Sequence, residues 1–152
     1  MSLLSYPHSM WRKKDVELLE THISCLTADS HRKWGSMSVA GMLAHCTLAL
    51  EVYSREFDLP MHTRWYASLS RIFALSRLPF PHGIRLPFDL PAEDGLDFEV
   101  ERRELLRALQ RFHEIPPTHV FKPHFILGEL NRKEFGMLAH KHTAHHLRQF
   151  GC

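Results

Sequence analysis

Two histidines four residues apart, His142 and His146, lie in the last stretch of the chain, residues 131–150. If this stretch is helical, side chains at i and i+4 lie one above the other on a single face, within roughly 6 Å. This spacing lets one helix offer two imidazole nitrogens to one metal ion. Because the chain contains 13 histidines, such a pair also arises by chance, and a hydrated polar helix end is the alternative interpretation.

A helix is expected here because Asn131 and Glu134 have the spacing of a capping box. Nothing in the sequence stops this helix before Gly151. On a helical wheel, an apolar stripe continues into polar side chains toward the C-terminal end. The stripe consists of Phe135, Leu138 and Ala139, followed by His142, His145, His146 and Gln149. His140 points to the other side of the helix, so we expect it to be solvated.

A third candidate ligand, His45, lies in a segment that is expected to be helical over residues 38–56. It shares the inward face of that helix with the apolar residues Met42, Leu48, Ala49 and Val52. Taken alone, His45 is better interpreted as a core histidine hydrogen-bonded to a carbonyl or a neighbouring side chain. The second inward-facing pair favours a shared metal site. Cys46 lies about 100° further round the helix and is interpreted as a small buried hydrophobe.

The composition predicts one domain, residues 1–152. A chain of 152 residues, 44% of them hydrophobic, buries enough surface to fold without disulfides or structural metals. Its formal charge is only +2 and the basic residues are scattered among acidic ones, so no nucleic-acid partner is implied.

Cysteine usage and hydropathy predict a cytoplasmic protein. The three cysteines are an odd number without C-x-x-C spacing, which argues against a disulfide framework and against a cysteine-based zinc site. A reducing cytoplasm is then the default compartment. No signal peptide and no run of 18 or so apolar residues is found, so no membrane association is expected.

The remaining segments complete an all-α prediction. Residues 1–10 lack periodicity and are interpreted as a flexible arm. Helical periodicity is found in residues 11–27, 61–77 and 98–113, with Trp65, Leu69, Ile72 and Phe73 expected to face inward in the second of these. A proline-rich connection, residues 78–97, is interpreted as a lid or as a structural strap. Its apolar side chains indicate that it packs against the helices: Phe80, Ile84, Leu86, Phe88 and Leu90. Residues 118–130 form a second irregular stretch, and no strand pattern occurs, so five helical segments in a bundle are expected.

Three sequence motifs resemble the DinB/YfiT-like superfamily of metal-binding helical proteins. They are W-G-x-M-S-x-x-x-M-L-A-H-C ending at Cys46, P-H-x-x-x-G-x-L from Pro123, and H-x-x-H-H-L-R-Q-F-G from His142. The last motif is similar to that of an uncharacterised branch whose members end in H-H-L-R-Q-F. The sequence departs from this branch at two positions, since Phe125 follows His124 in place of a proline and Ala144 stands where an aspartate often precedes the paired histidines.

The resemblance implies a four-helix bundle of the up-down-down-up type with long irregular connections. It also implies that His45, His142 and His146 ligate one divalent metal ion, the three residues that helical spacing selects independently. Superfamily members are often homodimers, so the resemblance further implies a possible homodimer.

Three imidazoles without a fourth protein ligand describe an open metal site, as in catalytic zinc centres. Zinc is expected first, while nickel, iron or manganese suit the same nitrogens. An enzyme is one hypothesis, either a hydrolase using metal-bound hydroxide or a transferase similar to bacillithiol and mycothiol S-transferases, acting on a small-molecule substrate or thiol co-substrate. A non-catalytic metal- or ligand-binding module is the alternative. A Ser-His-Asp or Cys-His nucleophile has little support because no G-x-S-x-G motif is present.

Residues near the expected metal ion are candidates for assisting it. His124 precedes the last helix and is interpreted either as a contact to a ligand or substrate or as a capping or surface histidine. His145 lies three residues after His142 and is the substitute for His146 if the helix is rotated slightly. Gln149, His145 and His124 are the polar groups expected at the mouth of the site.

Overall fold

The structure is a computed structural model that describes residues 6–54, 67–83 and 95–152. These residues form five α-helices: α1 (Lys13–Ser24), α2 (Val39–Ser54), α3 (Ala67–Ala74), α4 (Phe98–His113) and α5 (Arg132–Gln149). Within the same ranges there is no β-strand, only an isolated bridge between His124 and Gly128. The all-α prediction is therefore confirmed for the described residues. None of the helices seen there has the length and the apolar composition needed to cross a bilayer.

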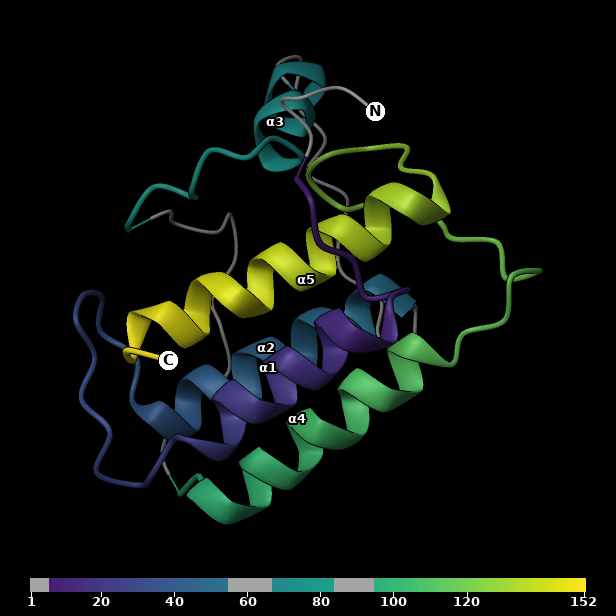
Figure 1. Cartoon of the computed structure of the whole chain (residues 1–152). Coiled ribbons are helices and arrows are strands. Elements are labelled where there is room, and N and C mark those ends of the chain that lie inside the picture. Colours follow the sequence, from purple (N-terminus) through teal and green to yellow (C-terminus); the bar gives the residue numbers. More distant parts are fainter. Residues whose placement is uncertain (1–5, 55–66, 84–94) are drawn as a thin grey trace.

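Four helices lie alongside one another, and α3 stands apart beside α5 (Figure 1). α1 and α5 run in one direction, whereas α2 and α4 run in the other. α2 packs against α4 and α5, and α1 packs against the same two helices. α2 and α4 are parallel neighbours, and residues 55–97 connect them along the chain.

The core between these helices is built from the apolar stripes that the sequence predicts. Val16, Leu19 and Ile23 of α1 are buried, and so are Leu105 and Leu109 of α4. The largest fully buried side chains include Phe112, Phe135, Leu19, Ile23, Leu43, Leu105 and Leu109. Residues of α2 and α5 that face this core fix the rotation of both helices, and thereby fix which of their side chains face each other.

The start of α5 is held by a capping box. The Asn131 Oδ1 atom accepts a hydrogen bond from the Glu134 amide at 3.0 Å, and Glu134 Oε2 accepts one from the Asn131 amide at 2.8 Å. Such caps contribute about 1 kcal/mol to helix stability. Glu134 also accepts two hydrogen bonds from Arg71 of α3, at 2.6 and 2.8 Å. One carboxylate therefore both begins α5 and binds α3 to it.

The end of α3 is held by Lys141, a buried residue of α5. Its ammonium donates to the carbonyl oxygens of Phe73, Ala74 and Ser76 at 3.3, 3.0 and 3.0 Å. The last carbonyls of a helix have no partner within the helix, so Lys141 satisfies them and places a positive charge at the negative end of the helix dipole.

The face that α3 presents differs from the predicted one. Leu69 and Ile72 were expected to be inward, but they are 70% and 68% exposed, so that prediction is wrong. α3 is held mainly by its polar anchors, Arg71 and the carbonyls bound by Lys141, and by half-buried Phe73. The predicted start of this helix, residues 61–66 with Trp65, and four apolar residues of the proline-rich connection, Ile84, Leu86, Phe88 and Leu90, lie outside the described residues.

The N-terminal segment also differs from the expected arm within its described part, residues 6–10. The Tyr6 amide donates to the Leu75 carbonyl at 2.8 Å, and Met10 is fully buried. The Tyr6 hydroxyl lies 2.9 Å from His140 Nδ1, and the His8 ring stacks on His140 at 5.2 Å between centroids. His140 is only 3% exposed, so the prediction that it is solvated is wrong, because this segment covers the side of α5 that faces away from α2.

Candidate metal centre

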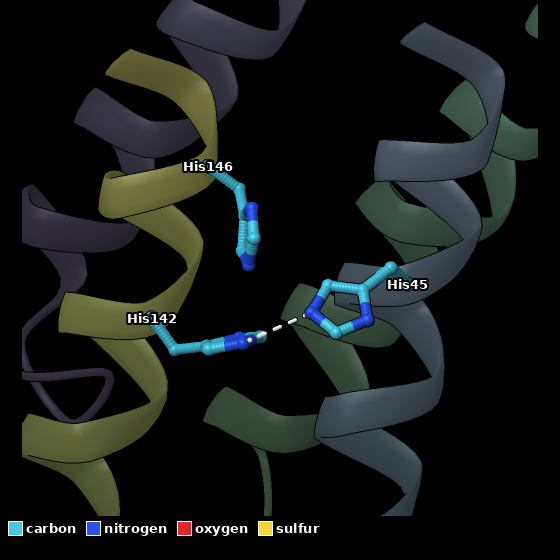
Figure 2. Close-up of side chains that lie close together, drawn as sticks. All are labelled: His45, His142 and His146. Carbon is cyan, nitrogen blue, oxygen red and sulfur yellow. Dashed lines mark hydrogen bonds between the residues drawn. The ribbon is translucent and has the colours of Figure 1, made fainter. Parts of the chain in front are cut away.

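Three imidazoles from two helices converge between α2 and α5. His45 lies on α2, and His142 and His146 lie one turn apart on α5 (Figure 2). The Nε2 atoms of His45 and His142 are 3.1 Å apart. The His146 ring points a nitrogen into the space between the other two rings. One ligand atom from each residue lies within 4.8 Å of the others, so the three histidines selected from the sequence are brought together.

These distances fit a divalent ion. Zinc–nitrogen distances of about 2.0–2.1 Å at tetrahedral angles place two ligand nitrogens roughly 3.3 Å apart. The separation of His45 and His142, 3.1 Å, is close to this value, and the ligand atom of His146 lies within 4.8 Å of the other two. The triad could therefore hold a metal ion.

The electrostatics of the site favour neutral imidazoles, the protonation state that metal ligation requires. Burial, reinforced by the charges of His146 and His145, lowers the pKa of His45 to about 3. Burial is also the first cause that holds the pKa of His142 well below its ordinary value, with His146 next. For His146, burial lowers the pKa while the hydrogen bond to Gln149 opposes the shift. Burial therefore favours the neutral form of all three imidazoles.

The outer nitrogens of the triad have different surroundings. His146 Nδ1 lies 3.0 Å from Gln149 Oε1, and Gln149 Nε2 donates to the Trp34 carbonyl at 2.7 Å. His45 Nδ1 is buried and has no hydrogen-bond partner in the described part of the chain. Gln149 was expected at the mouth of the site. It is instead only 3% exposed and contacts the outer ring nitrogen of His146, Nδ1.

His145 does not join the three converging rings. Its ring lies against an aromatic cluster formed by Trp34 at 5.9 Å, Phe80 at 5.6 Å and His82 at 6.3 Å between centroids. Trp34 and His82 stack on each other at 4.0 Å with an interplanar angle of 7°. In this structure, His146 is therefore the histidine that faces His45 and His142, and His145 lies to the side.

His124 is a buried turn residue. Its Nδ1 atom accepts hydrogen bonds from the amides of Ile126 and Leu127, both at 3.1 Å. The geometry therefore gives it the capping role that the sequence left open. Its ring lies 5.2 Å from that of Tyr53, which in turn lies 6.3 Å from that of His142. Tyr53 thus stands between His124 and the triad.

Cys46 has the buried position that the sequence predicts. It is 0% exposed, its Sγ atom lies 3.9 Å from Met42 Sδ, and burial raises the pKa of its thiol. A thiol held protonated in an apolar contact is a poor nucleophile. The converging group contains no carboxylate, so the chemistry that it offers is that of three neutral nitrogens.

Two residues near the triad, Trp34 and Tyr53, were not identified from the sequence. Trp34 lies outside every predicted helix, yet its carbonyl fixes Gln149 and its ring contacts His145. Tyr53 has the spacing of an apolar core residue on α2. The W-G pair that opens the first motif was the available signal for Trp34, whereas no local signal distinguishes Tyr53 from the rest of the core.

Comparison with known proteins adds a family assignment. Residues 14–151 match the family described as "Protein of unknown function (DUF1569)". No curated protein and no solved structure matches the chain significantly. Since the match extends from the first turn of α1 to beyond the end of α5, the chain belongs to the DUF1569 family.

Proposed function

We propose that the protein is a metal-dependent enzyme that holds one divalent ion with His45, His142 and His146. The observation that carries this proposal is the convergence of three neutral imidazoles, whose ligand atoms lie within 4.8 Å of one another. Burial favours the neutral form of each ring, in which one nitrogen has a free lone pair. Binding of a cation therefore does not require the prior loss of a proton from an imidazolium.

The number of ligands favours an active centre over a structural one. Structural zinc sites use four protein ligands, whereas catalytic sites keep a position for water or substrate. A divalent ion bound by three nitrogens lowers the pKa of a water or thiol in the remaining position and so supplies a nucleophile at neutral pH. Such chemistry needs no strong side-chain base, which suits a ligand group that, among the residues described, includes no carboxylate. We propose zinc as the first candidate, with nickel, iron or manganese as competitors.

The arrangement of the helices supports the same proposal. α1 and α5 run opposite to α2 and α4 (Figure 1), which is the up-down-down-up order that the resemblance to DinB/YfiT-like proteins implies. In such a bundle, sites are built from side chains on facing helices. The reaction that we propose is either hydrolysis or thiol transfer on a small molecule.

Elemental analysis of protein purified without a His tag or chelator tests the metal site. We expect one equivalent of a divalent metal in the wild type and its loss in the His142→Ala, His146→Ala double variant. His31→Ala removes an exposed histidine outside the site and serves as the matched control that keeps its metal. Stoichiometric metal that persists in the double variant would refute the ligand assignment.

Cobalt substitution tests the reaction. The cobalt-loaded protein is titrated with low-molecular-weight thiols while a sulfur-to-metal charge-transfer band is monitored, and a band supports thiol transfer. Metal-dependent turnover of an ester, amide or phosphoester supports hydrolysis. If no thiol coordinates and none of these substrates is turned over, the enzyme proposal fails in favour of a non-catalytic metal-binding module.

A further inference from the structure

Gln149 is the last residue of α5 and lies behind the triad, away from the space where the three rings meet. It is 3% exposed, although glutamine is a residue type that is mostly found at the surface. Both ends of its amide have partners, with Oε1 at 3.0 Å from His146 Nδ1 and Nε2 at 2.7 Å from the Trp34 carbonyl oxygen. Its burial is therefore compensated by hydrogen bonds, and one of these reaches a candidate ligand.

The Trp34 carbonyl determines which way round the amide lies. A carbonyl oxygen only accepts hydrogen bonds, so the group that faces Trp34 must be the NH₂ end of Gln149. The amide oxygen must then face His146, and because that oxygen also only accepts, His146 Nδ1 must carry the hydrogen. In a neutral imidazole the other nitrogen, Nε2, then keeps its lone pair. This lone pair is on the nitrogen that faces His45 and His142.

We propose that Gln149 is a positioning residue for the metal centre, which selects the tautomer and the ring orientation of His146 before the metal binds. The inference rests on the proposed metal site. It assigns His146 the role of the preorganised ligand, since His45 Nδ1 has no comparable partner within the ranges that the structure describes. Residues that hydrogen-bond to the outer nitrogen of a ligating histidine generally raise metal affinity 10–100-fold.

The loop between α1 and α2 holds this amide in place. The Lys33 amide donates to the main-chain oxygen of Gln149 at 2.6 Å, next to the side-chain contact with Trp34. Gly35 has a φ of +80°, and a Cβ atom at this position would lie 2.4 Å from Gln149 Nε2. Gly35 thus permits both the left-handed turn and the close approach of the amide. Through these contacts with Gln149, the loop influences the orientation of the His146 ring without contacting that ring.

Three variants separate positioning from simple packing. Gln149→Leu keeps the volume but removes both hydrogen bonds. Gln149→Glu keeps an acceptor for His146 while losing the donor to Trp34. Gly35→Ala displaces the amide without changing it. Gln110→Leu, at an exposed glutamine of α4, is the matched control.

Two measurements are made on each variant. Two-bond nitrogen–proton NMR of the metal-free protein reports the tautomer of His146, and competition with a chromophoric chelator reports the affinity for zinc. We expect the Nδ1–H tautomer in the wild type and a shift toward Nε2–H in Gln149→Leu. We also expect roughly 10–100-fold weaker zinc binding in that variant, a smaller loss in Gly35→Ala, partial rescue in Gln149→Glu and no change in Gln110→Leu.

The two readouts separate failure of this inference from failure of the proposed function. An unchanged His146 tautomer in Gln149→Leu, or zinc affinity equal to that of the wild type, overturns the positioning role. A wild type that binds none of zinc, nickel, iron and manganese overturns the metal site and the positioning role with it. A tautomer shift in the same sample then leaves Gln149 as a structural partner of His146 alone. Equal losses of zinc affinity in Gln149→Leu and Gln149→Glu, without a tautomer difference, assign the effect to packing.

Discussion

The environment of each histidine determines what its imidazole can do. His45, His142 and His146 are kept neutral by burial and face one another. His124 uses its Nδ1 to hold a turn, and His140 hydrogen-bonds to Tyr6 on the far side of α5. The same side chain therefore serves as a candidate ligand, a turn cap and a packing element within one small protein, according to which hydrogen bonds reach it.

His145 provides a test of ligand identity at this scale. Its ring lies against Trp34, Phe80 and His82, so we expect His145→Ala to keep stoichiometric metal, whereas His146→Ala loses it. Metal content is measured by elemental analysis of both variants, with matched thermal unfolding curves to show that each is folded. Retention of metal by His146→Ala together with its loss from His145→Ala would reverse the assignment and require α5 to be rotated.

The sequence was sufficient to find His142 and His146, because i, i+4 spacing on one helix is a local property, and His45 was found from its place on the apolar face of residues 38–56. The position of His140 was not predictable in this way. Helical periodicity places it opposite His142, but only the tertiary structure shows that the N-terminal segment covers that side. The contact of Gln149 with Trp34 was also out of reach, because the two residues are 115 positions apart and no periodic pattern links them.

At the scale of elements, α3 depends on polar anchors more than on apolar burial. Leu69 and Ile72 are largely exposed, while Glu134 of α5 binds Arg71 in the last turn of α3 and Lys141 of α5 binds the carbonyls at the same end. Lys141 is 1% exposed, with its Nζ atom 4.3 Å from the centroid of the Phe80 ring. Burial, with the charge of Arg148 second, lowers the pKa of Lys141 to about 8, so it remains mostly protonated at neutral pH.

We predict that Lys141→Met destabilises the attachment of α3. The substitution keeps the apolar stem but leaves three carbonyls without their donor, which costs about 1–3 kcal/mol. Hydrogen exchange should accelerate at the amides of α3 before it does so in α1 or α4, and thermal unfolding should shift downward by several degrees. Lys133→Met, at an exposed position of the same helix, is the control. Equal exchange rates in the two variants would show that Lys141 does not hold α3.

The helices with the clearest apolar periodicity were predicted best. α4 begins and ends at the predicted residues, because an Asp97 cap and a Pro116-Pro117 stop bound a clear apolar stripe. α3 was placed with the wrong face inward, since its apolar residues suggested burial while its attachment depends on Arg71 and on a lysine 65 or more positions away. Long-range polar contacts leave no periodic trace in the sequence.

At the scale of the whole molecule, Asp15 ties the N-terminal segment to the helices. Its carboxylate lies 3.0 Å from His8 Nδ1, 3.0 Å from the Ser9 amide and 2.6 Å from Arg12. Burial by itself raises the pKa of Asp15, but the hydrogen bonds from His8 and Ser9 and the charge of Arg12 outweigh it, so the net pKa is below 3.8. The ionised form of Asp15 is therefore favoured by folding.

We predict that Asp15→Asn lowers the free energy of unfolding at neutral pH by about 1–2 kcal/mol, a range reduced because His8 and Arg12 are partly exposed to solvent. A lowered folded pKa contributes stability above the unfolded value and loses it as the pH falls through the folded value. The difference between wild type and variant should thus persist from pH 7 to about pH 4 and vanish at lower pH. Urea unfolding across this range measures it, with Asp29→Asn as an exposed control. A difference that stays constant down to pH 2 would contradict the role of the charge.

Ligation should also be visible in global stability. A metal ion that binds only the folded state adds about 2.7 kcal/mol at 100 times its dissociation constant. We expect zinc to raise the melting temperature of the wild type and a chelator to reverse the shift. The His142→Ala, His146→Ala variant should show neither effect, and a zinc-dependent shift in it would point to a different binding site.

The distance between the two halves of the site along the chain has a consequence for the order of folding. His45 and His142 are 97 residues apart, so an ion shared by them is a cross-link that closes almost two thirds of the chain into a loop. At synthesis rates of about 5–20 residues per second, the nascent α2 waits on the order of 5–20 s for its partner histidines. During that interval His45 is the only one of the three candidate ligands that has been synthesised. Tight binding of an ion would therefore have to follow the packing of α5 against α2. If the proposed metal site is correct, binding of the metal would be a late event in folding, since it would require α2 and α5 to be packed together.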